Sequence, residues 1–313
     1  RLGRFLAEVR VEGRPEIVHV PNTGRMKELL VPGALVALRK AAAEATAPGG
    51  AVRAATARAR GRKTRYDLWA VKFGGVWVCV DSRAANDVAA GLLEAILETG
   101  GRNASRGTSC GMPSGAASGD AAGDRVRQAP SPLVQGTAGL REALRPLAQG
   151  MTGLRREVFS GPHRFDLAVL KGEAEALVEV KSVNLVEDGV AKFPDAPTTR
   201  GADHLRYLSR RARGGEEAYV LFVVQRSDAR LFRPHRGVDR AFAAALAEAA
   251  QSGVGVVAVR CEATPSAIRP VSALPVDIAG DAPPGSGEQE GGLAGEGVRK
   301  DDAHGFPGEG ERP

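Results

Sequence analysis

The order of strand-like and helix-like segments in residues 151–262 constrains the fold more than any other feature of the chain. Three alternating or apolar segments come first, followed by a helix, a buried strand, a second helix and a last strand. These segments span residues 154–161, 164–170, 176–183, 198–215, 218–225, 239–253 and 254–261. The turn sequence KGEAE between the second and third strands predicts a hairpin. The order βββαβαβ therefore predicts a mixed sheet with helices packed on it.

The first 82 residues have a different pattern, in which short strands alternate with turns that contain Gly and Pro. Five strand-like segments occupy residues 4–11, 16–21, 34–40, 66–73 and 76–82. Five strands in ~80 residues are typical of a small barrel of the oligonucleotide/oligosaccharide-binding (OB) type, although an SH3-like barrel would give much the same pattern. We therefore expect an α+β/α/β two-domain protein, with an OB-type β-barrel over residues 1–82 followed by a mixed-sheet α/β domain.

Two helices are expected between these regions. The first covers residues 85–100, and either Asn86 or Asp87 can cap its N-terminus. The second covers residues 139–150 and is expected to be broken by Pro146.

Two stretches lack the periodicity of packed elements. Residues 101–139 are rich in Gly, Ser, Ala and Pro, and Pro, Gly and acidic residues dominate residues 263–313. Such compositions bury too little apolar surface to fold, so we expect a disordered insertion and a disordered tail. The α/β domain would then comprise residues 83–100 and 139–262.

Charge and cysteine usage narrow the class of protein. The 313 residues carry a net charge of +6, which permits a polyanionic partner. The three cysteines Cys79, Cys110 and Cys261 lack the spacing of a zinc site or a disulfide framework. No segment has the ~20 consecutive apolar residues of a membrane helix, and the sequence does not open with the pattern of a signal peptide. We therefore expect a cytoplasmic protein that does not associate with a membrane.

Two charged residues interrupt the predicted strand ALVEVKSV. Glu179 and Lys181 lie two positions apart, so they share one face of the strand, with Cα atoms ~6.6 Å apart. Val178 and Val180 are expected to pack on the other face. The hairpin places Asp166, in the preceding strand, across from Glu179, which completes the pattern D-x12-E-x-K.

This group of charges has the composition of a metal-dependent hydrolytic site. Asp166 and Glu179 are candidate ligands for Mg²⁺, with Mn²⁺ as an alternative, because hard cations take carboxylate oxygens. Lys181 is a candidate catalytic residue that would orient the attacking water and offset developing charge. Glu157 is a candidate fourth acidic member. The alternative is that E-x-K is a chance pair on a solvated strand face, and the five histidines, with His204 expected at the surface, show no ligand spacing.

Three segments are candidates for contacts with phosphates or sugars. They are a polar loop within residues 19–30, a basic run within residues 58–66 and the start of the predicted helix at 198–215. The candidate nucleic-acid-binding residues are Asn22, Thr23, Arg25, Lys27, Lys63, Arg65 and Arg200. The alternative is that these are ordinary solvated loops and a capped helix.

Several long blocks resemble the sugar fermentation stimulation protein A family. They include VHVPNTGRMKELLVPGA, LRREVFSGPHRFDLAVL and VEVKSVNLVEDGVAKFPDAPTTRGADHLRYL, and the resemblance runs in order over residues 2–100 and 139–262. It implies an N-terminal OB-type barrel and a C-terminal domain similar to the restriction-endonuclease-like fold, whose D…ExK motif corresponds to Asp166, Glu179 and Lys181. It also implies DNA binding and a link to the regulation of sugar (maltose) metabolism. The sequence departs from the family at Ala85, where Pro is usual.

Three functions remain open on this basis. The first is a metal-dependent nuclease, and the second is a DNA-binding regulator that retains a nuclease fold without catalysis. The third is a barrel that binds an oligosaccharide, although its loops are basic rather than aromatic. We expect a nucleic-acid-binding protein, with DNA as the partner and a nuclease-type site, and the sequence also allows a homodimer.

Overall fold

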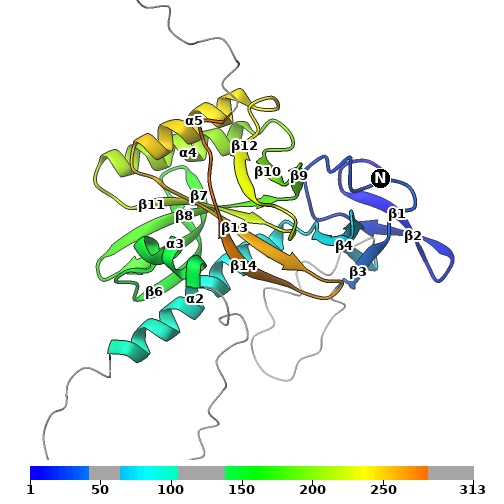
Figure 1. The fold of residues 1–313 in the computed structure, drawn as a ribbon, viewed down its shortest axis with the longest axis horizontal. Helices are drawn as coiled ribbons and strands as arrows, with labels where there is room; N and C mark the ends of the chain where they lie inside the picture. The colour runs from blue at the N-terminus through cyan, green and yellow to red at the C-terminus, as the bar shows by residue number, and fades with distance from the viewer. Residues whose placement is uncertain (42–63, 105–137, 281–313) are drawn as a thin grey trace, which may run out of the picture. The chain divides into compact units, whose positions relative to one another are not determined.

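One mixed sheet connects the strands of both expected regions in the computed structural model of the protein (Figure 1). The structure describes residues 1–41, 64–104 and 138–280, with the backbone alone for residues 99–104 and 138. Residues Arg1–Gly280 form one compact unit. Lys63, most of the expected insertion and the end of the expected tail lie outside the described residues.

The N-terminal part contains the five strands that the sequence predicts. They are β1 (Leu6–Val11), β2 (Arg14–His19), β3 (Val36–Lys40), β4 (Tyr66–Phe73) and β5 (Val76–Cys79). The pairs β1–β2, β3–β4 and β4–β5 are antiparallel, and β2 meets β4 in parallel at one residue pair. Val18, Met26, Leu29 and Leu68 are buried together inside this OB-type barrel.

The C-terminal part contains the predicted βββαβαβ order. Its elements are β6 (Gly153–Ser160), β7 (His163–Lys171), β8 (Ala174–Val183), α4 (Thr199–Arg213), β11 (Ala218–Val224), α5 (Arg240–Gln251) and β13 (Gly255–Ala263). The hairpin of β7 and β8 is antiparallel, whereas β8–β11 and β11–β13 are parallel, so the sheet is mixed as expected. Three short strands that the sequence did not predict form a second sheet: β9 (Leu185–Glu187), β10 (Val190–Phe193) and β12 (Leu231–Pro234).

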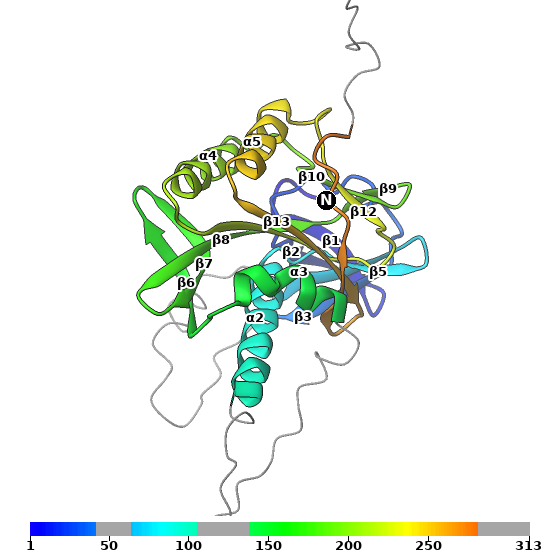
Figure 2. The same ribbon diagram turned by 60° about the vertical axis from the view of Figure 1, so that its left-hand side comes forward.

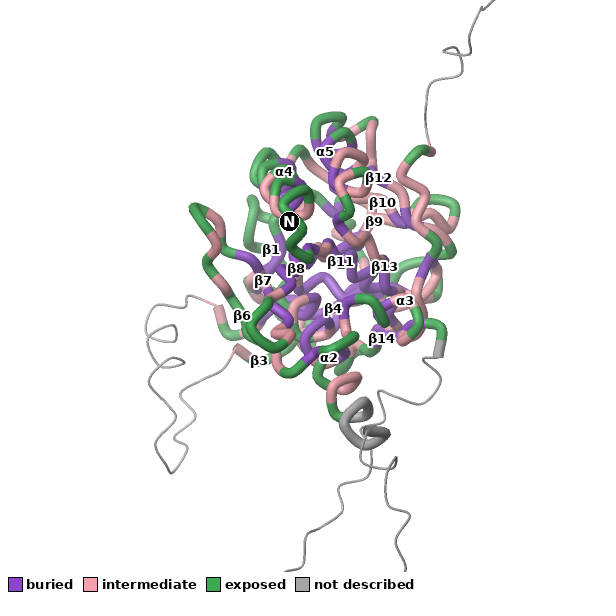
Figure 3. Tube along the Cα trace, turned by 90° about the vertical axis from the view of Figure 1, so that its left-hand side faces the viewer, coloured by how far each residue is buried: buried purple, intermediate pink, exposed green. Residues whose placement is uncertain are grey.

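Helices cover both faces of the α/β part of the large sheet. Helices α4 and α5 lie on one side, and α2 (Arg83–Ala104) and α3 (Ala138–Ala148) lie on the other (Figure 2). Consecutive strand residues alternate between the two cores: Leu177 and Phe222 pack on the α4/α5 side, and Val178 and Leu221 on the α2/α3 side. The central strands are buried along much of their length (Figure 3).

Both predicted helices between the two regions exist, but their details need correction. Helix α2 begins at Arg83, because the Asp81 carboxylate accepts a hydrogen bond from the Arg83 backbone N–H at 3.0 Å. Asn86 is therefore inside the first turns rather than at the cap. Helix α3 continues through Pro146 and ends two residues later at Ala148, so the expected break is corrected. No helix in the described part of the chain has the length and apolar character needed to cross a bilayer.

The predicted start of the disordered tail, at residue 263, is wrong because ordered structure continues beyond it. Residues after 263 form β14 (Ile268–Leu274), which pairs antiparallel with β13 in a register that shifts near Cys261 and Pro270. Among the described strands, β14 pairs only with β13, and a proline is tolerated in such an edge strand because its missing N–H need not serve a second neighbour. The structured unit therefore extends to Gly280.

Candidate active site

The β7–β8 hairpin stops pairing where the predicted charged group begins. The two strands pair from Lys171 opposite Ala174 up to Leu167 opposite Val178. One residue further, the Asp166 carboxylate accepts a hydrogen bond from the backbone N–H of Val180 at 2.8 Å. This side chain satisfies a backbone donor in place of the neighbouring strand, and it fixes Asp166 beside the residue that follows Glu179.

Strand β8 points Glu179 and Lys181 toward the α4/α5 side of the sheet. Leu177 and Val183 lie on the same side, whereas Val178 and Val180 are buried on the α2/α3 side, which confirms the predicted division of faces. Glu179 is only 4% exposed. A carboxylate this deeply buried needs charged or hydrogen-bonding partners to offset the loss of hydration.

The partners of Glu179 all lie on one of its two oxygens. The Lys181 Nζ atom is 2.6 Å from Glu179 Oε1, and the His204 Nδ1 atom is 2.8 Å from the same oxygen. The second oxygen, Oε2, is buried and has no hydrogen-bond partner among the residues that the structure describes. A buried carboxylate oxygen without a partner is rare, and it marks a position where a donor or a cation would be stabilised.

The two carboxyl groups respond differently to this environment. Burial raises the pKa of Glu179, but Lys181 and His204 outweigh that effect and hold the pKa below its ordinary value. Burial and the nearby charge of Glu179 raise the pKa of Asp166, against the opposing effects of Val180 N–H, Lys181 and Asn86. The site thus holds one stable carboxylate beside another whose charge is unfavourable without a further cation.

Two residues of this site were not recognised in the sequence. Asn86, on α2, donates from Nδ2 to Asp166 Oδ1 at 2.8 Å, so both Asp166 oxygens are held. His204, on α4, is 2% exposed rather than at the surface, because α4 packs this face of its helix against the sheet. The only sequence signal for His204 is its position four residues after Arg200, which places both on one helix face.

Glu157, the candidate fourth acidic member, faces solvent rather than this group. Glu157 stands opposite Asp166 in the β6–β7 register, at a pair where the two strands are not bridged, and its φ is 53°. Its side chain is 69% exposed and 3.8 Å from Arg164, so the expectation of a fourth acid in the site is corrected. Asp195 instead accepts a hydrogen bond from the Met26 backbone N–H at 3.4 Å and holds a barrel loop.

The predicted nucleic-acid contacts divide into buried and exposed residues. The prediction that Asn22 contacts nucleic acid is corrected, because Asn22 is only 7% exposed. Its side-chain amide donates to Val80 O at 2.9 Å and to Asn184 Oδ1 at 3.1 Å. It joins the barrel loop to the end of β8. The remaining described candidates are all exposed: Thr23, Arg25, Lys27, Arg65 and Arg200.

The barrel loop and the start of α4 lie near each other. Arg25 and Lys27 flank Met26, whose backbone is anchored to Asp195, five residues before Arg200. The Arg200 Nε atom donates to His204 Nε2 at 3.3 Å, which connects this basic region to Glu179. The barrel loop is therefore anchored to the segment before α4, and Arg200 on α4 is connected to Glu179 through His204.

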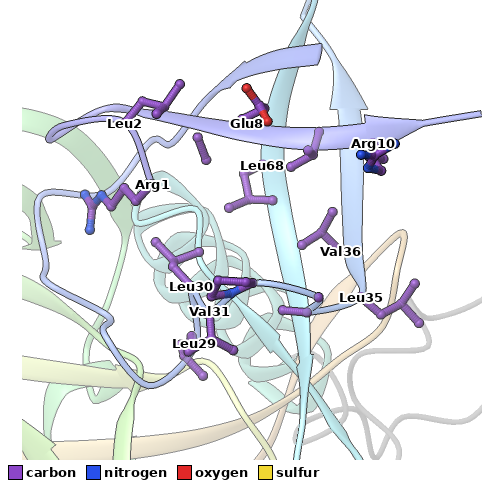
Figure 4. Close-up of a pocket in the computed structure, with 15 residues that line it drawn as sticks. Arg1, Leu2, Glu8, Arg10, Leu29, Leu30, Val31, Leu35, Val36 and Leu68 are labelled. Atoms are coloured by element: carbon purple, nitrogen blue, oxygen red, sulfur yellow. The ribbon is translucent and has the colours of Figure 1, made fainter. Parts of the chain in front are cut away.

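A separate groove of about 670 Å³ lies on the barrel (Figure 4). Aliphatic side chains such as Leu2, Leu30, Val31 and Leu35 line most of it, and none of its 15 lining residues is aromatic. Sugar rings usually stack on aromatic side chains, so this groove does not favour the oligosaccharide hypothesis. None of the residues that surround Glu179 lines it.

Family models and similar proteins identify both parts of the chain. The model described as "Sugar fermentation stimulation protein RE domain" matches residues 129–267, and the model described as "SfsA N-terminal OB domain" matches residues 1–46. A sugar fermentation stimulation protein homolog of Desulfitobacterium hafniense (strain Y51) is 33% identical over 268 residues, covering 86% of this chain and 89% of its own length. The homolog of Acetivibrio thermocellus is 36% identical over 262 residues, covering 84% and 86%.

A solved structure agrees with this assignment at the level of the fold. The structure of Pyrococcus furiosus SfsA in complex with Ca²⁺ has a TM-score of 0.63 and 24% sequence identity, and the match covers 88% of this chain and 92% of that one. The OB-type barrel and the mixed-sheet α/β part are therefore those of a known architecture. With relatives above 30% identity over most of its length, the chain belongs to the sugar fermentation stimulation protein family.

Proposed function

We propose that this protein binds DNA and hydrolyses phosphodiester bonds at a divalent-metal site formed by Asp166, Glu179 and Lys181. The observation that carries the proposal is the buried Glu179 Oε2, which has no hydrogen-bond partner in the described part of the chain, while Lys181 and His204 contact Oε1. The arrangement fixes the carboxylate and leaves one oxygen for a cation.

The donor set fits a hard cation of the Mg²⁺ type. The described residues contain no group of three or more His, Cys, Asp or Glu side chains that could enclose an ion. Mg²⁺ commonly uses one or two carboxylates and completes its coordination with water and substrate phosphates, so two carboxylates are enough. The Pyrococcus furiosus protein was solved in complex with Ca²⁺, another cation that binds oxygen ligands.

Each side chain has a distinct task in this proposal. A bound metal would act as a Lewis acid on the phosphodiester and lower the pKa of a water molecule. Asn86 and the Val180 N–H orient Asp166. Lys181 holds Glu179 in place. Its side chain is 14% exposed, and its ammonium group can stabilise negative charge that develops on the phosphate.

The exposed cations near the site would hold the DNA backbone. Thr23, Arg25 and Lys27 on the barrel loop and Arg200 on α4 are suited to phosphate contacts, which position a duplex without reading its sequence. The net charge of +6 agrees with a polyanionic partner.

The second candidate is a DNA-binding regulator of sugar (maltose) metabolism that performs no hydrolysis. The family description as a sugar fermentation stimulation protein favours this role. The carboxylates argue against it, because Asp166 and Glu179 would repel phosphate unless a cation lay between them.

Duplex affinity is expected to increase when Ca²⁺ replaces EDTA, and to decrease with salt. Replacing both Arg25 and Lys27 by alanine should weaken binding and lower the slope of log K against log[salt] by about 2, because two phosphate contacts are lost. Fluorescence anisotropy of a labelled short duplex at several salt concentrations measures both effects.

The matched control replaces Arg10 and Arg14, two exposed arginines of the β1–β2 hairpin, by alanine. This change removes the same charge and should leave the salt slope unchanged. An affinity that is equal in Ca²⁺ and EDTA would favour the regulator, and equal losses in both double variants would remove the barrel loop from the DNA-binding surface.

A further inference from the structure

His204 lies between an exposed arginine and the carboxylate of Glu179. It is 2% exposed, and its ring packs against His163 and Phe165, with centroid distances of 5.1 and 5.2 Å. This packing fixes the plane of the imidazole. The ring therefore presents its two nitrogens in two fixed directions.

The two nitrogens of His204 have different partners. Nε2 accepts a hydrogen bond from Arg200 Nε at 3.3 Å. A nitrogen that accepts a hydrogen bond carries no proton, so the hydrogen-bond network assigns the ring proton to Nδ1. Nδ1 lies 2.8 Å from Glu179 Oε1, an ion-pair distance, and it makes no hydrogen bond with the described residues. Arg200 thus sets the tautomer whose Nδ1 proton lies beside the carboxylate.

Arg200 is placed to sense a phosphate. It lies in the first turn of α4, where backbone N–H groups and the helix dipole attract anions. Its side chain is exposed, and within the described chain its terminal nitrogens have no hydrogen-bond partner, because only Nε is used. A guanidinium group can bind phosphate through these terminal nitrogens while Nε remains on His204.

The geometry points to a relay, from Arg200 through His204 to Glu179, that couples phosphate binding to cation binding. A phosphate bound to Arg200 restricts the motion of its guanidinium group. The restricted guanidinium keeps His204 Nδ1 beside Glu179 Oε1, and this contact keeps Oε2 oriented toward the cation. His204 is a positioning residue in this relay, and the relay rests on the proposed function. Coupling is reciprocal, so bound DNA increases the affinity for the cation by the same factor by which the bound cation increases the affinity for DNA.

The dissociation constant of Ca²⁺, measured by calorimetry with and without a short duplex, tests this coupling. In the wild type we expect the duplex to lower the dissociation constant of Ca²⁺ by at least about fivefold, which is the lower end of common coupling factors. His204→Asn places an amide nitrogen near the position of Nδ1 but has no group at Nε2. This variant should lose the effect of the duplex on the Ca²⁺ dissociation constant.

Two further variants separate the relay from a purely structural role. Arg200→Lys keeps the positive charge on the exposed surface but removes the Nε donor, so at a duplex concentration that saturates the variant its Ca²⁺ dissociation constant should no longer respond to the duplex. His204→Gln retains an acceptor near Nε2 and loses the donor to Glu179, so its Ca²⁺ affinity should decrease even without DNA. A residue that serves only packing would give the same Ca²⁺ affinity in the Asn and Gln variants. Urea denaturation of each variant checks that it is folded.

The outcomes distinguish the relay from the site on which it rests. Loss of coupling in both His204→Asn and Arg200→Lys, with Ca²⁺ still bound by the free proteins, supports the relay. Coupling that persists in these two variants would overturn the relay and leave the metal site standing. A wild-type protein that binds no Ca²⁺ would overturn the metal site and the relay together.

Discussion

The variant Lys181→Met is expected to cleave duplex DNA more slowly than the wild type by a factor of about 10²–10³, the usual cost of removing one group that stabilises transition-state charge. Its DNA affinity should change little, because Lys181 is largely buried beside Glu179 and is not among the exposed cations. Single-turnover cleavage of an end-labelled duplex in Mg²⁺, Mn²⁺ or EDTA measures the rate, and anisotropy measures the affinity.

Lys171→Met is a closely matched control for this variant. Lys171 lies at the other end of the β7–β8 hairpin, its side chain is 13% exposed, and it pairs with Glu217 at 2.5 Å. The same substitution there should leave the cleavage rate unchanged. Cleavage that is equally fast in Lys181→Met would indicate a contaminating nuclease, and DNA binding by the wild type without cleavage in any metal would favour the regulator.

The variant Asp228→Ala is expected to lose about 3 kcal/mol of unfolding free energy, at the lower end of the cost of breaking a buried ion pair. Arg226 is 1% exposed and forms two hydrogen bonds with the Asp228 carboxylate, at 2.7 and 2.6 Å. Without Asp228 the guanidinium charge stays buried and unpaired. The cost is at the lower end because the Asp228 side chain is 36% exposed. Urea denaturation measures the change.

A surface pair and the pH dependence provide the controls for this prediction. Asp203→Ala removes the exposed Asp203–Arg206 pair and should cost less than about 1 kcal/mol. Burial raises the pKa of Asp228, but Arg226 outweighs it and lowers the pKa below 3.8. A depressed pKa stabilises the fold above the unfolded-state value and loses that contribution as the pH falls through the folded-state value. The difference between wild type and Asp228→Ala should therefore narrow below pH 3.8, and a difference that stays constant on acidification would contradict this account.

Local patterns were sufficient to predict the strands and one face of the site. The alternation in ALVEVKSV placed Glu179 and Lys181 opposite Val178 and Val180, and the short KGEAE turn placed Asp166 nearby. These predictions depend only on the two-residue period of a strand and on a hairpin, so they need no knowledge of distant segments.

The missed residues depend on contacts between segments that are far apart in the sequence. Asn86 reaches Asp166 across 80 positions, and Asn22 reaches Asn184 across 162. The sequence shows that such residues are polar, but the packing of α2 and of the barrel loop decides whether they face solvent or the site. His204 was missed for the same reason, because its burial depends on which face of α4 meets the sheet.

Single local irregularities account for the other corrections. The β6–β7 register is the same on both sides of Glu157, but its backbone has a φ of 53° and its side chain is 69% exposed, which the regular alternation of a strand does not predict. The content of Pro, Gly and acidic residues after residue 263 predicted a tail, although an edge strand such as β14 can contain a proline, here Pro270. Composition describes the average character of a segment, whereas pairing with β13 depends on individual positions.

The most direct test of the central claim is calorimetric titration of Mg²⁺, Mn²⁺ and Ca²⁺ into the wild type and into the double variant Asp166→Asn/Glu179→Gln. The double variant Asp87→Asn/Glu157→Gln is the control, because it removes the same charge from two carboxylates that are 73% and 69% exposed. We predict binding to the wild type and the control, and none to Asp166→Asn/Glu179→Gln. Equal binding to all three proteins would contradict a metal site at Asp166 and Glu179.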